Sequence, residues 1–517
     1  MNGAEILLKT AAAAGVDVCF SNPGTTEMPI VAAFDNIKSV KPVLCLFEGV
    51  CTGAADGFGR IKGLPALTLL HLGPGFANGI ANLHNARRAG TPVVNIVGDH
   101  PTWHLAADAP LTMDIASLAK PVSLWQRYNE SVETLPADLV EAIKASLYGG
   151  VSTLIVPNDC QWLEYTAGAT ARVDFSFDPV DAKRIDDAAK ALNDAKKPLL
   201  LIGGAVLREA GLKTAARIQA MTGCEFMMTG FPGHMDRGNG LPSPRRVPYF
   251  PEEAVKMLAP YDVVILAGMD APVAFFGYRD GQSKILGEDT TAIRIDGEKQ
   301  NALDAVAALA DSISKVSNKA DAAYTPGNDP KPELPMGRLS RGVACRTIAA
   351  LQPENAIIVD EGLTSSGAYL LMDSGLSPHT YLTNMGGSIG WGMPCATGAA
   401  IAAPNRPVIN FQADGSGMYT AQALWTQARE NLDITTLVCK NNRYSILQAE
   451  YLRAGNKTSG SLVASLIELD RPTIDWVNIS WGMGVPAVSV DTCEDLAKEF
   501  KKALGEEGPH LIEMNLG

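Results

Sequence analysis

The stretch that decides the fold is VINFQADGSGMYTAQALWTQARENLDITTLVCKNN, which runs from Val408 to Asn442. A short apolar run is followed by a turn at Asp414–Gly417, by apolar residues at helical spacing, and by a second apolar run at Ile434–Cys439. This order predicts a βαβ unit, whose crossover brings the carboxyl ends of both strands to one edge of a parallel sheet. Asp414 and Asn442 are therefore expected to converge.

A carboxylate and an amide oxygen at one sheet edge suit Mg²⁺, which takes one or two protein ligands and fills its other positions with phosphate oxygens and water. Gly415 and Gly417 would let the backbone approach a diphosphate, and the helix start behind them would offer unpaired N–H groups. Either motif alone is explained as well by turn residues at a strand end. Their combination around one βαβ unit is what favours a cofactor site.

This combination resembles the cofactor motif of thiamine diphosphate (ThDP) enzymes, in which an Asp-Gly-Ser turn is followed by Asn-Asn at a strand end. The family motif usually opens with Gly, where this chain has Ala413, and the change leaves both side-chain ligands in place. The resemblance implies that Asp414, Asn442 and the backbone carbonyl of Tyr444 hold Mg²⁺, which in turn holds the diphosphate. The further cofactor contacts that it implies in this part of the chain are Gly415, Ser416, Ser445, Thr364, Gly387 and Ile389.

Gly387 and Ile389 belong to a glycine-rich loop, residues 386–392, that precedes an Ala-rich segment. In the family this loop supplies a bulky apolar residue under the bent cofactor and a carbonyl for its amino group. By register these roles fall on Ile389 and Gly387. A plain glycine turn before a helix would explain the same residues.

Composition limits the classes of protein that this chain can be. Its 517 residues predict about three domains. A net charge of -13 without a basic cluster argues against nucleic acid or an anionic membrane as a partner. The nine cysteines are scattered singly, and neither a signal peptide nor a membrane span is recognisable. We therefore expect a cytoplasmic protein.

The order of apolar segments predicts an α/β fold with three consecutive domains, each a parallel sheet flanked by helices. The expected domains are residues 1–165, 182–317 and 335–517, with a Pro-rich linker at 324–333. By resemblance these are the pyrimidine-binding, central and diphosphate-binding domains of the pyruvate decarboxylase and acetolactate synthase architecture. The central domain carries FAD in acetolactate synthases, but no Gly-x-Gly-x-x-Gly motif supports FAD here.

Glu48 follows the apolar run Val43–Phe47 and precedes a helix of small residues. The residues alone favour a structural role, because a carboxylate stabilises the start of a helix. The resemblance reverses this choice, since Glu48 matches the Glu that contacts the aminopyrimidine ring in ThDP enzymes. There it hydrogen-bonds ring nitrogen N1′ and favours the imino tautomer that activates the cofactor.

His71 ends a predicted strand at Leu67–Leu70, where a lone His is more often structural than catalytic. Its context resembles benzoylformate decarboxylase, in which a His in the equivalent stretch moves protons near the substrate. That enzyme has Asn-Pro-Gly-Ser where this chain has Asn-Pro-Gly-Thr, and its second active-site His has no counterpart near Phe275–Tyr278. The implied catalytic residues are Glu48, His71 and Thr25, and the implied cofactor contacts of this domain are Asn22, Pro23, Gly24 and Glu48.

The resemblance covers the whole chain and implies a ThDP- and Mg²⁺-dependent enzyme. The leading hypothesis is non-oxidative decarboxylation of a 2-oxo acid, with ligation of the product to an aldehyde or ketone acceptor. The alternatives are acetolactate formation from two pyruvates, as in the acetolactate synthase large-subunit proteins that the chain also resembles, and a 2-hydroxyacyl-CoA lyase, against which the early carboxyl end argues. A weakly active ThDP-binding regulatory protein is the alternative from another class.

In this family the cofactor lies between the first domain of one subunit and the third domain of another. The resemblance therefore implies a homodimer as the smallest active unit, and a homotetramer is common.

Overall fold

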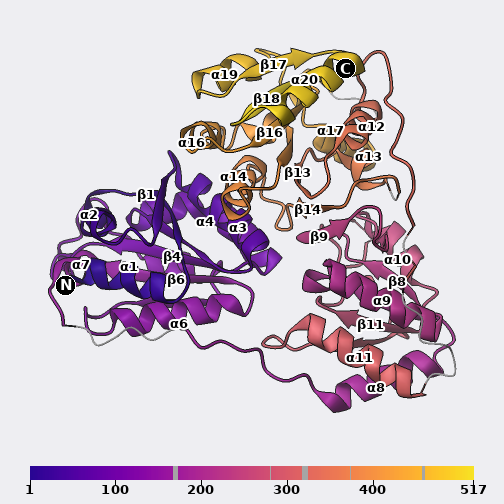
Figure 1. Cartoon of the computed structure of the whole chain (residues 1–517), viewed down its shortest axis with the longest axis horizontal. Coiled ribbons are helices and arrows are strands. Elements are labelled where there is room, and N and C mark those ends of the chain that lie inside the picture. Colours follow the sequence, from indigo (N-terminus) through magenta and orange to yellow (C-terminus); the bar gives the residue numbers. More distant parts are fainter. Residues whose placement is uncertain are drawn as a thin grey trace. The chain divides into compact units, whose positions relative to one another are not determined.

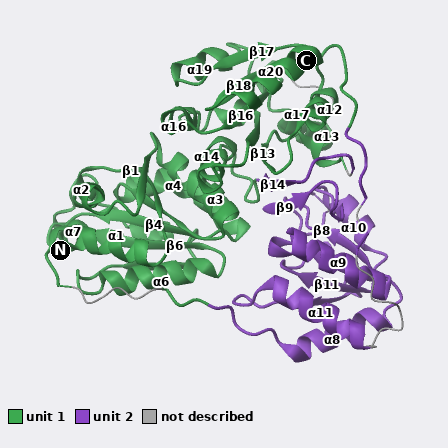
Figure 2. Ribbon diagram, in the orientation of Figure 1, with its two compact units in different colours: residues 1–175, 332–372, 384–517 green, residues 176–331, 373–383 purple. Residues whose placement is uncertain are grey.

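The computed structural model describes residues 1–166, 173–279, 281–316, 324–325, 327–372, 374–456 and 460–516. The chain divides into two compact units (Figure 2): unit 1 holds residues 1–175, 332–372 and 384–517, and unit 2 holds residues 176–331 and 373–383. Three sheets built mainly of parallel strands, with helices beside them, confirm the predicted α/β class (Figure 1). The strands of the first and most of those of the third sheet belong to unit 1.

The first sheet is entirely parallel and has the strand order β2-β1-β3-β4-β6-β5. Helices α1, α2 and α6 contribute to the apolar cluster on one face, and α3, α4 and α5 to the cluster on the other. The elements are α1 (Gly3–Ala13), β1 (Val18–Asn22), η1 (Thr25–Glu27), α2 (Met28–Asn36), β2 (Lys41–Leu44), α3 (Glu48–Lys62), β3 (Ala66–Leu70), α4 (Leu72–Ala89), β4 (Val93–Asp99), η2 (Leu105–Ala107), α5 (Ile115–Ala119), β5 (Trp125–Tyr128), α6 (Leu135–Leu147), β6 (Val151–Pro157) and α7 (Asn158–Trp162).

The third sheet contains the βαβ unit that was predicted from the sequence. Strands β15 and β16 pair in parallel, from Val408 with Ile434 to Ala413 with Cys439, and the order within unit 1 is β17-β18-β16-β15-β13. The elements are α12 (Arg341–Leu351), β13 (Ala356–Glu361), α13 (Gly367–Leu370), α14 (Gly392–Ala402), β15 (Val408–Ala413), α15 (Asp414–Gly417), α16 (Ala423–Arg429), β16 (Ile434–Lys440), α17 (Ser445–Arg453), α18 (Ser461–Ile467), α19 (Trp476–Gly482), β17 (Ala487–Val490), α20 (Cys493–Gly505) and β18 (His510–Asn515).

Within unit 1, helix α3 packs directly on helix α14 through small residues. A Cβ atom at Gly57 would overlap the carbonyl of Cys395, and one at Gly398 would overlap the carbonyl of Ala54. Beside this contact, the buried Asp56 carboxylate pairs with Arg60 at 2.7 Å and accepts a 2.6 Å hydrogen bond from the Trp391 indole. The two helices therefore meet backbone to backbone, next to a buried and fully partnered charge.

Unit 2 has a five-stranded parallel sheet of order β10-β8-β7-β11-β12, and it also holds β9 and β14, the antiparallel last two strands of the third sheet. The elements are α8 (Ala182–Asp194), β7 (Pro198–Ile202), η3 (Gly204–Leu207), α9 (Glu209–Thr222), β8 (Glu225–Met228), β9 (His234–Arg237), β10 (Arg245–Arg246), α10 (Pro251–Leu258), β11 (Val263–Ala267), β12 (Thr291–Arg294), α11 (Ala302–Val316) and β14 (His379–Thr383).

The described residues of the predicted linker, 324–325 and 327–333, form neither helix nor strand, while Pro326 lies outside the described residues. All nine cysteines lie in described segments and are buried free thiols. Among the described residues, no helix has both the length and the apolar character needed to cross a membrane.

Candidate active site

Asp414 lies at the carboxyl end of β15 and is the first residue of α15. Its carboxylate is buried and accepts main-chain hydrogen bonds from Gly415 at 2.9 Å, Asn441 at 2.9 Å and Asn442 at 2.6 Å. Burial raises the pKa of Asp414 above its ordinary value, and the N–H donors act in the opposite direction. No ion pair to Asp414 is found in the described part of the chain. The carboxylate is fixed in place and has no cationic partner there.

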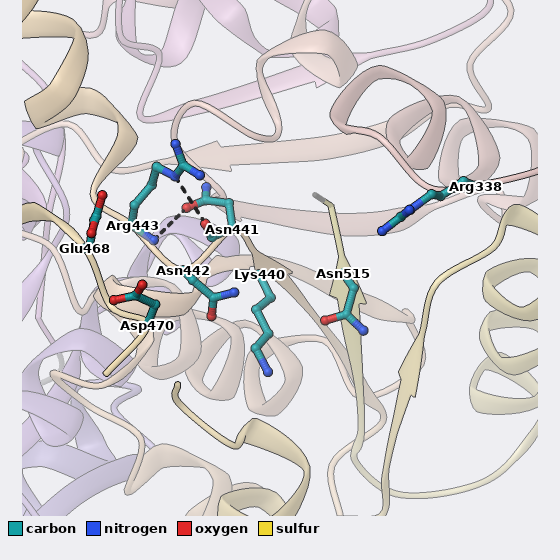
Figure 3. Close-up of a pocket in the computed structure, with 8 residues that line it drawn as sticks. All are labelled: Arg338, Lys440, Asn441, Asn442, Arg443, Glu468, Asp470 and Asn515. Carbon is teal, nitrogen blue, oxygen red and sulfur yellow. Dashed lines mark hydrogen bonds between the residues drawn. The ribbon is translucent and has the colours of Figure 1, made fainter. Parts of the chain in front are cut away.

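The neighbouring amides Asn441 and Asn442 are directed to different sides of the chain (Figure 3). Asn441 is buried; its Nδ2 lies 3.4 Å from Ser365 Oγ, and its Oδ1 accepts the main-chain N–H of Arg443 at 3.0 Å. Asn442 is more exposed and adopts a left-handed φ of 53°. The loop that carries Thr364 therefore meets the side chain of Asn441.

Asn442 lines a charged cavity of about 310 Å³ at the carboxyl ends of β16 and β18 (Figure 3). Lys440 in this cavity pairs with Glu513 at 2.9 Å. The lining residues are Arg338, Lys440, Asn441, Asn442, Arg443, Glu468, Asp470 and Asn515. Neither Asp414 nor Thr364 lines this cavity, although both Asn441 and Asn442 line it and donate their main-chain N–H groups to Asp414.

The backbone carbonyls of Arg443 and Tyr444, which follow these amides, differ in the hydrogen bonds that they accept. The Tyr444 carbonyl accepts hydrogen bonds from Leu447 N at 3.0 Å and Gln448 N at 3.3 Å, because it is the first acceptor of helix α17. The Arg443 carbonyl accepts a hydrogen bond from Ser445 N at 3.1 Å and is not drawn into the helix. The Tyr444 ring instead packs over Gly415, where a Cβ atom would come within 2.6 Å of it.

Ser416 and Ser445 are both engaged by other side chains. Ser416 Oγ accepts a hydrogen bond from Gln412 Nε2 at 2.7 Å, and Ser445 Oγ accepts one from Arg341 Nη2 at 3.2 Å. Ser416 is buried directly beside Asp414, whereas Ser445 begins α17. The structure therefore places Ser416, but not Ser445, in the immediate surroundings of the carboxylate.

Glu48 is the first residue of α3, and its side chain is buried. One carboxylate oxygen, Oε2, accepts a hydrogen bond from Asn78 Nδ2 at 3.0 Å. The other oxygen faces Gly75, where a Cβ atom would approach it to 2.9 Å, and it has no hydrogen bond within the described residues. Glu48 is thus a buried carboxylate with one oxygen held and one oxygen available.

His71 lies at the junction of β3 and α4 and contacts the buried carboxylate of Glu27. The distance from His71 Nδ1 to Glu27 Oε2 is 2.7 Å, and Thr26 Oγ1 lies 3.4 Å from the same nitrogen. The hydrogen bond to Glu27, with a smaller electrostatic contribution from Glu48, raises the pKa of His71 above its ordinary value. Nε2 has no partner in the described part of the chain, so this ring nitrogen is available to a ligand.

The loop that was predicted from its Asn-Pro-Gly-Thr sequence lies at the end of β1 and the start of η1. Asn22, Pro23 and Gly24 are half-buried, and Gly24 lies so close to His71 that a Cβ atom would overlap the imidazole ring. Thr25 is exposed, whereas the following residue, Thr26, is buried and contacts both Glu27 and His71. Of the two adjacent threonines, it is therefore Thr26 whose hydroxyl lies next to the imidazole.

The glycine loop is fixed by one fully buried carboxylate, Glu361, at the end of β13. It accepts main-chain hydrogen bonds from Gly390 and Gly392 at 2.9 Å and from Trp391 at 3.1 Å. Burial raises the pKa of Glu361, and these donors oppose the rise. Helix α4 holds the same loop, because Asn85 Nδ2 donates to the Ser388 carbonyl at 2.8 Å. Gly387 is exposed with a φ of 76°, and Ile389 is half-buried.

Glu27, Asn78 and Glu361 were not predicted as site residues. Glu361 ends β13 after the apolar run Ile357–Val359, which is the signal that singled out Glu48, whereas Glu27 follows the polar pair Thr25-Thr26 and lacks that signal. Asn78 carries no such signal, because its contact with Glu48 depends on how α4 packs beside α3. A carboxylate at the end of an apolar strand is thus a marker that identifies more residues than the one to which it was applied.

The donor set can be compared with what ThDP and Mg²⁺ require. A buried carboxylate without a cationic partner, a buried amide and a main-chain carbonyl are oxygen ligands of the kind that Mg²⁺ takes. No cluster of three or more His, Cys, Asp or Glu suited to a metal is found among the described residues, so the other ligands would come from phosphate and water. The free oxygen of Glu48 suits a ring nitrogen. The residues of the candidate site therefore fit ThDP and Mg²⁺.

Comparison with known proteins finds similar sequences that extend over nearly the whole chain. A model described as "Thiamine pyrophosphate enzyme, N-terminal TPP binding domain" matches residues 1–118, and the corresponding C-terminal TPP binding domain matches residues 364–514. The chain is 44% identical over 99% of both sequences to the Mycobacterium tuberculosis protein named "Putative acetolactate synthase large subunit IlvX". It is 27% identical to benzoylformate decarboxylase of Pseudomonas aeruginosa, over 97% of this chain and 96% of that protein.

The solved structure of the Rhodococcus jostii ThDP-dependent 4-hydroxybenzoylformate decarboxylase matches with a TM-score of 0.86 and 25% identity, covering 100% of both chains. These matches extend over both sheets of unit 1 and over unit 2. The chain therefore belongs to the thiamine diphosphate-dependent enzymes, as a carbon–carbon lyase or transferase of the group that includes the 2-oxo acid decarboxylases and the acetolactate synthases.

Proposed function

We propose that the enzyme decarboxylates an aryl 2-oxo acid without oxidation and can ligate the product to an aldehyde or ketone. The observation that carries this proposal is His71, whose Nε2 is open while its Nδ1 is bound to Glu27 at 2.7 Å. Decarboxylation to an aldehyde needs a proton donor at the carbon that has lost CO₂, and an imidazole with one free nitrogen can supply it. The names of the benzoylformate and 4-hydroxybenzoylformate decarboxylase relatives support the aryl substrate class.

When bound, ThDP supplies a nucleophilic carbon and an electron sink for the departing CO₂. Glu48 would receive the cofactor's aminopyrimidine ring on its free oxygen, while Asn78 keeps the carboxylate oriented. Glu361 would keep Gly387 and Ile389 in place beneath the cofactor by fixing the end of their loop. His71 would give its Nε2 proton to the product carbon, and Thr25 would contact the substrate from the edge of η1.

Mg²⁺ would be held by Asp414 together with the amide of Asn441 and the carbonyl of Arg443. These groups take the place of Asn442 and the Tyr444 carbonyl in the ligand set expected from the sequence. Two observations support the change: Asn441 Nδ2 lies 3.4 Å from Ser365 Oγ, beside Thr364, and the Tyr444 carbonyl is used by α17. The diphosphate would then lie between Asp414 and the loop of Thr364.

We further propose a homodimer or homotetramer as the active form. Leucines on α17 and α18 leave large apolar surfaces in contact with solvent in the single chain, as expected of an interface. Leu462 is 82% exposed and Leu466 is 79% exposed. Light scattering of the purified protein should give a mass of at least twice 54.7 kDa. A monomer that turns over at its full rate would contradict this assembly.

Acetolactate formation from two pyruvates is the second candidate, because the relative with 44% identity carries an acetolactate synthase name. The two reactions are separated by product analysis with ThDP and Mg²⁺, in which benzoylformate and pyruvate are supplied in parallel. Benzaldehyde from benzoylformate with little acetolactate from pyruvate supports the decarboxylase. Acetolactate from pyruvate without benzaldehyde refutes it and returns His71 to a structural role.

A further inference from the structure

Glu27 is a fully buried carboxylate next to the presumed proton donor. Its Oε2 lies 2.7 Å from His71 Nδ1 and 2.8 Å from Gly24 N, and its Oε1 accepts a 2.6 Å hydrogen bond from Thr26 Oγ1. Burying an ionised carboxylate is costly unless a charged or hydrogen-bonding partner compensates it. A protonated His71 provides both kinds of compensation, so Glu27 and the imidazolium stabilise each other.

The backbone is shaped around this pair. A Cβ atom at Gly98 would overlap Glu27 Oε1, and one at Gly24 would overlap the His71 ring. Two glycines, one at the end of β4 and one before η1, therefore leave room for the carboxylate and for the imidazole. Because neither position tolerates a side chain, the ring and the carboxylate are held together with little freedom.

The other charged groups around the pair come from α3 and from the end of β4. Glu48 interacts electrostatically with His71, and Asp99, which accepts a hydrogen bond from His100 N, interacts with Glu27. Burial raises the pKa of Asp99, with a contribution from the charge of Glu27. Of these groups, Glu27 forms a hydrogen bond with the His71 ring at Nδ1, which sets it apart from Glu48 and Asp99.

We infer that Glu27 is a positioning residue for proton transfer, which directs the Nδ1–H of His71 to its own carboxylate and leaves Nε2 as the nitrogen that delivers the proton. This inference rests on the proposed role of His71. In the step, the Nε2–H bond breaks as a C–H bond forms on the carbon that has lost CO₂. The imidazolium becomes neutral and keeps its proton on Nδ1, and solvent then returns a proton to Nε2.

Two consequences follow for the full-length enzyme. The neutral ring should be the Nδ1–H tautomer, because the hydrogen bond at one nitrogen decides which nitrogen keeps the proton. The imidazolium should also persist to higher pH than an isolated imidazole, because its pKa is raised by Glu27. Turnover should therefore decline on the alkaline side of its pH profile only where the His71 imidazolium loses its Nε2 proton and becomes the neutral ring.

The first test needs no variant of Glu27. Nitrogen-15 NMR of the histidine-labelled wild-type protein, with His71→Gln used to assign the His71 signals among the seven histidines, reports which nitrogen carries the proton. At a pH above the His71 titration, we expect the Nδ1–H tautomer. The Nε2–H tautomer would overturn the inference whether or not any Glu27 variant folds.

The second test uses Glu27→Gln, which keeps the shape of the side chain and removes its charge. We expect the His71 titration in the NMR spectrum to move to lower pH, the alkaline limb of kcat to move with it, and turnover at pH 8 to fall about tenfold while KM changes little. Glu506→Gln is the matched control, since Glu506 contacts His510 Nε2 at 3.0 Å outside the site. It should leave the profile unchanged.

The two readouts separate the inference from the function on which it rests. A His71 titration that moves in Glu27→Gln without a matching move in the kcat profile would refute His71 as the proton donor. An unchanged His71 titration in that variant would refute Glu27 as the positioning residue while leaving the decarboxylase proposal in place.

Discussion

Asp414 and Glu48, the two carboxylates proposed to hold the metal and the cofactor ring, are held in opposite ways. Asp414 accepts hydrogen bonds from three main-chain N–H groups on two loops, so its position is part of the backbone fold. Within the described residues, Glu48 accepts a single side-chain hydrogen bond, from Asn78, and keeps one oxygen open. The difference suits the proposed roles, in which Asp414 holds a metal ligand without moving and Glu48 exchanges a hydrogen-bonded partner.

Asp414→Ala should produce the largest effect, because it removes a metal ligand and leaves three N–H groups without their acceptor. Loss of a group that merely supports a ligand lowers metal affinity about 10–100-fold, so loss of the ligand itself should cost more than about 100-fold in Mg²⁺-dependent ThDP binding. Calorimetry measures this. Asp433→Ala is the control, since Asp433 accepts the main-chain N–H of Gly508 at the start of β16, away from the site. Tight binding by Asp414→Ala would remove Asp414 from the ligand set.

Glu48→Gln tests the other half of the comparison. The variant should bind ThDP and Mg²⁺ within a few-fold of the wild type, because the diphosphate contacts lie elsewhere, while kcat falls by about 10²-fold or more through loss of an acid–base group. The affinity measured on the same preparation is the internal control. A variant with undiminished kcat would show that Glu48 has only a structural role at the start of helix α3.

The amides Asn441 and Asn442 form a matched pair of positions, since they are identical residues with different surroundings. Asn441→Ala should weaken Mn²⁺ or Mg²⁺ binding about 10–100-fold in the presence of ThDP, whereas Asn442→Ala should change it by no more than about threefold. Electron paramagnetic resonance with Mn²⁺ gives both affinities directly. The reverse order of effects would restore the ligand set expected from the sequence.

The smallest expected effect is on the stability of the fold, and it comes from the pairing of His71 with Glu27. Because the folded pKa of His71 is raised, its pairing with Glu27 should stabilise the fold fully below the unfolded pKa of about 6.5 and be lost as pH rises through the folded pKa. A partly exposed pair of this kind contributes about 1 kcal/mol or less. Urea unfolding at pH 6 and pH 9 should show this loss in the wild type and a smaller one in Glu27→Gln; equal losses would contradict it.

The βαβ unit and the convergence of its two strand ends could be predicted because they follow from apolar periodicity and from the handedness of the crossover. The different surroundings of the two adjacent asparagine side chains, with Asn441 buried near Ser365 and Asn442 more exposed, could not be predicted. Residue 442 has a positive φ, and a single left-handed residue after a strand changes the direction of the side chains that follow. The family motif gave the pair of residue types, but it could not give the twist of this turn.

The contacts of Glu27 and Asn78 were also beyond prediction from the sequence. Each depends on a packing partner from a separate element, β3 for the first and α3 for the second. By contrast, the burial of Glu48 could be anticipated, because the apolar strand before it and the small residues after it leave it little room to reach solvent. Local pattern thus anticipated the burial of Glu48, and tertiary packing decided which side chains contact Glu48 and His71.

The glycine contacts between helices α3 and α14 have a consequence for how this enzyme can diversify. Glu48 begins α3, and the loop of Gly387 and Ile389 runs directly into α14. In a cofactor site shared between subunits, these two parts of one chain serve two different sites, and the spacing between those sites is set where the two backbones touch. No side chain at Gly57 or Gly398 takes part in setting that spacing, and none can be added without separating the helices. Changes in the loops that select the substrate should therefore leave the spacing between the two cofactor sites to which one chain contributes unchanged.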